Sequence, residues 1–187
     1  LIINYFFKNK KKGVYIDVGC YHPYNGNNTK LLYDRGWSGI NIDLDFHTID
    51  FFNFIRKRDE NINIAISEKE GEKDLYFFHN RSAINSLSEI RKKYAKEIKS
   101  IKTKTLNSII ENSKFKHEKI NLLSIDVEGH EYFLLLGAKK LIKNNQLTIQ
   151  CEVINNKKKV FRFMKENKFK LIYHSKGTDD YIFSNYT

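Results

Sequence analysis

The stretch Gly13-Val14-Tyr15-Ile16-Asp17-Val18-Gly19 decides the fold of this 187-residue chain. Between its two glycines the stretch is mostly β-branched and apolar, which is typical of a short buried strand. Its only charged residue, Asp17, stands near the carboxyl end, where parallel sheets bind their ligands. We therefore predict that residues 14–18 form a buried strand of an α/β sheet.

Strands and helices alternate after this segment. Further strands are predicted at residues 39–42, 62–66, 74–78, 122–125, 148–153, 169–173 and 181–183. Helices are predicted at residues 28–35 (capped by Thr29 or Asn27), 46–56, 132–143 (interrupted at Gly137) and 160–167, with helical pieces around 89–96 and 107–112. This alternation predicts a mostly parallel sheet covered by helices on both faces, and the last two strands predict an antiparallel edge.

A chain of 187 residues is expected to form a single domain, residues 1–187, with a sizeable core. Its residues are 41% hydrophobic, which excludes a disordered chain, and no apolar run approaches the roughly 20 residues that span a bilayer. The apolar residues 1–7 are followed by lysines, the wrong order for a signal peptide. Cys20 and Cys151 lack the spacing of a zinc site, so we expect reduced thiols in a cytoplasmic protein. The chain begins with Leu rather than Met, which is compatible with residues upstream.

The formal net charge is +11, from 33 basic and 22 acidic residues. Lys supplies 27 of the basic residues, and the chain contains 20 Asn and 23 Ile but only 4 Ala, a composition that A/T-rich codons alone can produce. Arg, whose planar group pairs with phosphates and base edges, is rare. We therefore interpret the charge as solvated surface rather than a nucleic-acid site, and it is compatible with peripheral contact to an anionic substrate or membrane surface.

Acidic residues stand at the carboxyl ends of two of the predicted strands, the edge where α/β sheets bind ligands. Gly19 lets a ligand approach the backbone, and Asp43 ends the next strand 24 residues later, a spacing that suits an acid bound to ribose hydroxyls. The glycine patterns that bind pyrophosphate are missing, because residues 20–23 contain no glycine. A nucleoside without phosphates fits better. S-adenosylmethionine is one, since its ribose suits Asp43 and its positive charges suit Asp17.

A second polar segment follows the predicted strand at 122–125, with four ionisable side chains within six positions. Desolvated charges are costly, so this arrangement indicates a solvated or functional site. Here the sequence resembles the FkbM-type family of S-adenosylmethionine-dependent methyltransferases. The resemblance runs from about residue 14 to 153 and rests on Tyr15-Ile16-Asp17-Val18-Gly19, Asn41-Ile42-Asp43, Asn63-Ile64-Ala65-Ile66-Ser67 followed by Glu70-Gly71, and, most specifically, Ile125-Asp126-Val127-Glu128-Gly129-His130-Glu131.

The resemblance implies a class I methyltransferase fold, a Rossmann-like three-layer sandwich around a mostly parallel seven-stranded sheet with an antiparallel edge. Members typically methylate hydroxyl groups of sugars or other natural products. By resemblance, Asp17 and Gly19 would line the methionine end of the cofactor, and Asp43 would hold its ribose. Many members carry Glu-Pro-Asn after the second strand, where this chain has Asp43-Leu44-Asp45, so the acid is retained but shorter.

The resemblance also assigns residues around the adenine and the reaction cleft. Ala65 and Ile66 would flank the adenine. Asp126 would complete the cofactor-binding set and, together with Glu128, would face the reaction cleft.

Methyl transfer to a hydroxyl is assisted by a positioned base, and we rank His130, Glu128 and His22 in that order as candidates. The acids beside His130 are expected to raise its pKa and orient its ring. Each candidate has a simpler alternative role: His130 caps a helix, His22 shapes a turn, and Glu128 binds backbone N–H groups.

Two further groups of polar residues have open interpretations. Asp126, Glu128 and Glu152 can together hold a divalent cation, because oxygen ligands suit Mg²⁺, but solvated carboxylates explain them too, and no metal is predicted. The polar residues 80–88, which include Arg81, are either an acceptor-binding lid or an ordinary surface loop.

The sequence therefore predicts a cytoplasmic S-adenosylmethionine-dependent methyltransferase that O-methylates a saccharide or glycoconjugate precursor. The alternatives are an RNA ribose methyltransferase and a non-catalytic methyltransferase-like module of a larger protein. Methylation of exocyclic base amines is disfavoured, because Ile125-Asp126-Val127-Glu128 stands where such enzymes carry a proline-containing motif. The missing glycines disfavour a nicotinamide oxidoreductase.

Overall fold

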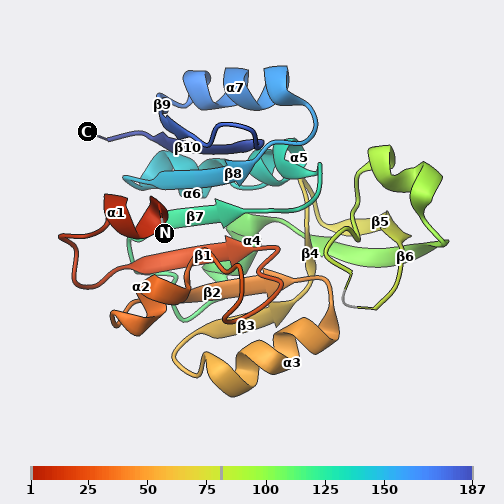
Figure 1. Ribbon diagram of the computed structural model, residues 1–187, viewed down its shortest axis with the longest axis horizontal. Coiled ribbons are helices and arrows are strands. Elements are labelled where there is room, and N and C mark those ends of the chain that lie inside the picture. The colour runs from red at the N-terminus through yellow and green to blue at the C-terminus, as the bar shows by residue number, and fades with distance from the viewer. Residues whose placement is uncertain (1, 81, 187) are drawn as a thin grey trace.

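A seven-stranded sheet forms the centre of the computed structural model, which describes residues 2–80 and 82–186 (Figure 1). In spatial order its strands are β3 (Glu60–Asn63), β2 (Ser38–Asp43), β1 (Val14–Val18), β7 (Ile120–Ile125), β8 (Thr148–Glu152), β10 (Asp180–Ser184) and β9 (Lys170–His174). Neighbouring strands are parallel, except that β10 runs antiparallel to both β8 and β9. The predicted α/β fold, with a mostly parallel sheet and an antiparallel edge, is confirmed.

Helices cover both faces of this sheet (Figure 1). The helices of one face are α4 (Leu106–Glu111), α5 (Glu131–Leu136), α6 (Lys139–Asn144) and α7 (Lys157–Glu166). Those of the other face are α1 (Ile2–Phe6), α2 (Lys30–Asp34) and α3 (Phe46–Ile55). No helix within residues 2–80 or 82–186 combines the length and hydropathy that a membrane crossing requires.

Both faces of β1 are buried, which explains its continuous apolar sequence. Val14, Ile16 and Val18 pack into the larger cluster on the α4–α7 side, whereas Tyr15 packs with α1 and α2 on the opposite side. The polar side chain of Asp17 therefore points toward the second face, at the end of a strand that is otherwise apolar.

A smaller, three-stranded sheet lies beyond the carboxyl ends of the parallel strands (Figure 1). In spatial order it contains β4 (Ala65–Ile66), β6 (Glu97–Lys104) and β5 (Gly71–Phe77), with β4 parallel and β5 antiparallel to β6. A short 3-10 helix, η1 (Glu89–Tyr94), precedes β6.

The small sheet is where the sequence predictions were least accurate. The strand predicted at residues 62–66 is divided at Ile64, so that its first part belongs to the large sheet and its last part to the small one. The helical piece predicted around residues 89–96 is the 3-10 helix η1. Strand β6 was not predicted, because its sequence EIKSIKTK is rich in lysine and only Thr103 is buried, which leaves little apolar signal.

Candidate active site

A cavity opens where β1, β2 and β7 end opposite the small sheet. The space between its lining residues is about 980 Å³ when the part open to solvent is counted. Most of the predicted site residues line it: Asp17, Gly19, Asp43, Ala65, Ile66, Asp126, Glu128 and His130. Among the described residues of its lining several are acidic, and none is Lys or Arg.

Asp17 is buried at the end of β1 and is held by two side chains from the following loop. Its Oδ2 accepts hydrogen bonds from Thr29 Oγ1 (2.9 Å) and Asn27 Nδ2 (3.0 Å). Burial raises the pKa of Asp17, and these hydrogen bonds oppose the rise. Thr29 is the N-cap residue of α2, as predicted, but its side chain makes no capping hydrogen bond. Its hydroxyl donates a hydrogen bond to Asp17 instead.

The loop after β1 is anchored by Arg56, which the sequence did not single out. Arg56 is 0% exposed, and its Nη2 donates to Asn27 Oδ1 (2.7 Å) and to the carbonyl oxygen of Pro23 (2.9 Å). Its Nη1 donates to the hydroxyl of Tyr15 (3.1 Å) and lies 3.9 Å from Asp59 Oδ2. Arg56 therefore positions Asn27 and, through Asn27, the carboxylate of Asp17. No local pattern marks a lone arginine at a helix end as buried.

Asp43 ends β2, and both of its carboxylate oxygens accept backbone hydrogen bonds. Oδ2 accepts from the N–H of Tyr21 (3.0 Å) and Oδ1 from the N–H of Asp45 (2.8 Å). Burial raises the pKa of Asp43 to about 6 despite these hydrogen bonds. Each oxygen retains a second lone pair, so Asp43 can still accept hydrogen bonds from hydroxyl groups of a ligand.

The ends of β1 and β7 lie against each other at Gly19 and Asp126. The N–H of Asp126 donates to the carbonyl oxygen of Val18 (3.0 Å), and the N–H of Gly19 donates to that of Ile42 (2.9 Å). Gly19 has a φ of +77°, and a Cβ built on it would lie 1.7 Å from the carbonyl oxygen of Asp126. The position therefore needs glycine both for its conformation and for space.

His130 is the N-cap residue of α5, and its ring is buried beside the cavity. The side chain makes no capping hydrogen bond; its Nε2 lies 2.8 Å from Ser67 Oγ, and the ring stacks on Phe133 with centroids 4.9 Å apart. The expectation that acids raise its pKa is wrong. Burial, reinforced by Lys73, lowers the pKa of His130 to about 4, and Glu68 opposes this only in part. The imidazole is therefore neutral at neutral pH.

Glu128 stands in a tight turn that directs it toward the cavity. Glu128 and Gly129 have φ values of +54° and +100°, and Ser86 Oγ donates to the carbonyl oxygen of Glu128 (2.9 Å). The carboxylate pairs with Arg91 of η1, and burial raises its pKa while Arg91 opposes the rise. The amide-binding role considered for Glu128 belongs instead to Glu131, which accepts from the N–H of Gly129 (2.6 Å).

His22 does not belong to the described lining of the cavity. Its Nδ1 accepts hydrogen bonds from the backbone N–H groups of Tyr24 (3.1 Å) and Asn25 (3.0 Å), and its ring packs edge-on against Phe51. The ring therefore holds the turn after β1, which is the simpler of the two roles predicted for it. Its position does not support a catalytic role.

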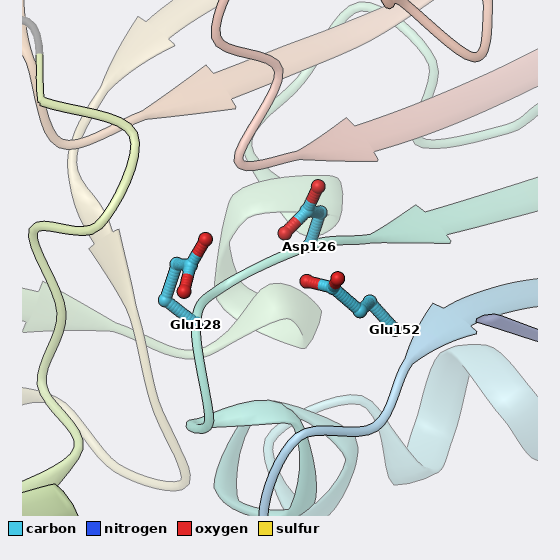
Figure 2. A group of neighbouring side chains, drawn as sticks. All are labelled: Asp126, Glu128 and Glu152. Carbon is cyan, nitrogen blue, oxygen red and sulfur yellow. The ribbon is translucent and has the colours of Figure 1, made fainter. Parts of the chain in front are cut away.

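Asp126, Glu128 and Glu152 bring three carboxyl groups together at the ends of β7 and β8 (Figure 2). One oxygen from each lies within 4.8 Å of the others, and the carboxyl group of Glu152 is directed toward the other two. Burial and the neighbouring Glu152 raise the pKa of Asp126.

The polar stretch 80–88 forms part of the cavity wall. Ser82, Asn85 and Ser86 belong to the lining, whereas Arg81 lies outside the described residues. Asn85 is buried and anchored, since its Oδ1 accepts from the N–H of Phe78 (2.8 Å) and its Nδ2 donates to the carbonyl oxygen of His79 (2.9 Å). The stretch lies at the cavity as expected, and its contact with an acceptor stays a prediction.

This chain is similar to known methyltransferases in sequence and in fold. The sequence model of the methyltransferase FkbM domain matches residues 17–171. The methyltransferase FkbM from Methylobacillus flagellatus KT superposes with a TM-score of 0.61 at 11% identity, over 93% of this chain and 44% of that protein. A TehB-like SAM-dependent methyltransferase from Corynebacterium glutamicum ATCC 13032 Kitasato has a TM-score of 0.46 at 9% identity, over 96% of this chain and 83% of that protein. No curated protein matches significantly. The chain thus spans less than half of the first structure, and that likeness concerns the fold alone.

Proposed function

This chain belongs to the FkbM methyltransferase family, whose domain matches residues 17–171, and we propose that it uses S-adenosylmethionine to methylate a hydroxyl group of a saccharide or glycoconjugate precursor. The observation that carries this proposal is the acidic lining of the cavity. In a chain of net charge +11, the described lining residues include Asp17, Asp43 and Asp45 but neither Lys nor Arg. Such a lining attracts a positively charged nucleoside and repels phosphates.

The residues present suit the cofactor. Asp43 offers carboxylate lone pairs to ribose hydroxyls, and Asp17 offers a negative charge to the cationic methionine end. Ala65 and Ile66 supply the apolar surface that a purine base needs, and Gly19 leaves the adjoining backbone uncovered.

When bound, S-adenosylmethionine supplies the methyl group: the acceptor oxygen bonds to the methyl carbon, and the carbon–sulfur bond breaks with its electron pair left on sulfur. The protein contributes mainly alignment, which can be worth roughly 7–11 kcal/mol. His130, held neutral beside the cavity, is the proposed acceptor of the hydroxyl proton. A proton acceptor beside the cavity favours a substrate that is methylated on a hydroxyl oxygen. The proposal that this substrate is a saccharide rests on the family resemblance.

Replacing Asp43 with alanine is expected to weaken binding of S-adenosylmethionine about 10–150-fold. This range corresponds to the roughly 1.5–3 kcal/mol of hydrogen bonds to a charged group. Isothermal titration calorimetry with the cofactor and with S-adenosylhomocysteine measures the change. A screen of glycan, sugar-nucleotide and RNA acceptors, followed by mass spectrometry, then identifies the methylated product.

The matched control is Asp34→Ala, which removes the same charge from the exposed surface of α2, where Asp34 pairs with Lys30. Its affinity for the cofactor should equal that of the wild-type protein. Equal affinities of Asp43→Ala and Asp34→Ala for the cofactor would contradict the assignment of Asp43 to the ribose. A wild-type protein that binds neither S-adenosylmethionine nor S-adenosylhomocysteine would contradict the proposed function.

Binding of S-adenosylmethionine is expected to strengthen as the pH rises from 5 to 7. The pKa of Asp43 is about 6 in the folded protein and about 3.9 in an unfolded chain. Between these values the folded protein binds more protons at Asp43, so this group's contribution to the free energy of unfolding falls as pH rises. The ionised carboxylate formed above pH 6 is the stronger acceptor for ribose hydroxyls. Calorimetric titrations at several pH values give log Kd for S-adenosylmethionine as a function of pH, and its slope should differ between the wild type and Asp43→Asn. Equal slopes in the two proteins would contradict the assignment of Asp43.

A further inference from the structure

The ring of His130 is hydrogen-bonded to a residue that directly follows a strand of the small sheet. His130 is 4% exposed and Ser67, directly after β4, is 0% exposed, and the two side chains meet at 2.8 Å between Nε2 and Oγ. Gly137, at the end of α5, makes this approach possible, since a Cβ there would lie 2.2 Å from the carbonyl oxygen of Ser67. The ring stacks on Phe133, and His130 itself lines the cavity.

The contacts continue from Ser67 to the protein surface. Ser67 Oγ also contacts Glu68 Oε2, and the other oxygen of Glu68 accepts from Lys73 Nζ at 2.9 Å. Burial acts to raise the pKa of Glu68, but the hydrogen bonds from Ser67 and Lys73 outweigh it and lower the pKa to about 2. Glu68 is thus a carboxylate at neutral pH, and a carboxylate can only accept hydrogen bonds.

The direction of each hydrogen bond follows from this chain of contacts. Ser67 has one hydroxyl proton and must donate it to Glu68, so toward His130 the Ser67 oxygen can only accept. Nε2 of His130 must therefore carry the proton of the neutral imidazole, which leaves Nδ1 with its lone pair. Within the described residues, Nδ1 of His130 has no hydrogen-bond partner.

We propose that Ser67 and Glu68 are positioning residues that hold His130 in the Nε2–H tautomer, so that Nδ1 accepts the proton released by the acceptor hydroxyl. The inference rests on the proposed function. As the acceptor oxygen bonds to the methyl carbon, its proton passes to Nδ1 and gives an imidazolium whose Nε2–H remains bonded to Ser67. Water later takes the proton from Nδ1 and restores the neutral ring. The charged groups that face the ring are Glu68 and Lys73, of opposite sign.

Glu68→Gln reverses the chain of hydrogen bonds and so tests the proposal. Lys73 can only donate, so the amide oxygen should face Lys73 and the amide nitrogen should donate to Ser67. Ser67 would then donate to Nε2 of His130, and the ring proton would move to Nδ1. The long-range ¹H–¹⁵N NMR spectrum of the histidine rings, assigned with His130→Gln, reports the tautomer directly. We expect a protonated Nδ1 in Glu68→Gln, with kcat lowered about 10–100-fold and an unchanged Kd for S-adenosylmethionine.

Two further variants complete the experiment. Glu72→Gln is the matched control, because Glu72 accepts from Ser100 Oγ (3.0 Å) on the exposed small sheet and has no histidine beyond it. It should keep the wild-type tautomer and kcat. Ser67→Ala removes the link itself and should lower kcat at unchanged cofactor Kd even if Glu68→Gln does not fold.

The outcomes separate the inference from the proposed function. A wild-type protein that transfers methyl groups but carries the proton on Nδ1 would overturn the inference alone, as would a Glu68→Gln protein with the wild-type tautomer or with unchanged kcat. A wild-type protein that shows the Nε2–H tautomer but binds no S-adenosylmethionine would instead overturn the proposed function, and with it the catalytic part of the inference.

Discussion

Replacing His130 with alanine is expected to lower kcat by about 10²-fold, the lower end of the usual contribution of a positioned general base, because a pKa of about 4 makes the imidazole a weak base at neutral pH. The ring lies beside the cavity, and its pKa of about 4, lowered by burial and by Lys73, keeps it unprotonated at neutral pH. A neutral imidazole has the free lone pair that a proton acceptor needs. The Kd for S-adenosylmethionine should stay close to the wild-type value, because Asp17 and Asp43, which are proposed to bind the cofactor, lie at the ends of β1 and β2. Steady-state kinetics and calorimetry on the same preparation separate the two effects.

His22→Ala provides the comparison, since His22 is the other histidine considered as a base. Its Nδ1 accepts two backbone N–H groups, so its loss should lower the melting temperature and reduce kcat far less than the loss of His130. Added imidazole should restore part of the activity of His130→Ala by occupying the vacated space. If kcat falls more in His22→Ala than in His130→Ala, the assignment of the base is wrong.

Gly19→Ala is expected to cost about 2–5 kcal/mol in the free energy of unfolding. The new Cβ would lie 1.7 Å from the carbonyl oxygen of Asp126, and the backbones of both residues are hydrogen-bonded at the ends of β1 and β7. The two strand ends must therefore separate, which also moves Asp126 at the cavity. Urea denaturation measures the loss of stability, and calorimetry should show weaker cofactor binding in the fraction that remains folded.

Gly177→Ala isolates the conformational part of this cost. Gly177 has a φ of +84°, close to the +77° of Gly19, but a Cβ built there meets nothing within 4 Å. Its replacement should cost only the roughly 1–2 kcal/mol of a left-handed residue. Equal losses of stability in the two variants would contradict the close approach of Gly19 to Asp126.

Much of the architecture followed from the local sequence. The β-branched run at Val14–Val18 and the strands and helices that alternate after it predicted the parallel sheet, because each strand is buried on both faces and needs an apolar sequence throughout. The interruption at Gly137 was likewise visible, since glycine ends α5 before α6 begins. Strand β6 was missed because an exposed, lysine-rich strand carries little of that apolar signal.

The sequence by itself also determined which acids would meet, because parallel strands place their carboxyl ends at one edge of the sheet, and Asp17, Asp43 and Asp126 each stand at such an end. Only the tertiary structure decided what surrounds them. Ser67 reaches His130 across 63 residues of chain, and Arg56 reaches Asn27 across 29. Neither pairing leaves a periodic pattern in the sequence. The low pKa of His130 was likewise set by tertiary structure, because burial depends on everything packed around the ring, whereas its sequence neighbours are acids that suggested the opposite shift.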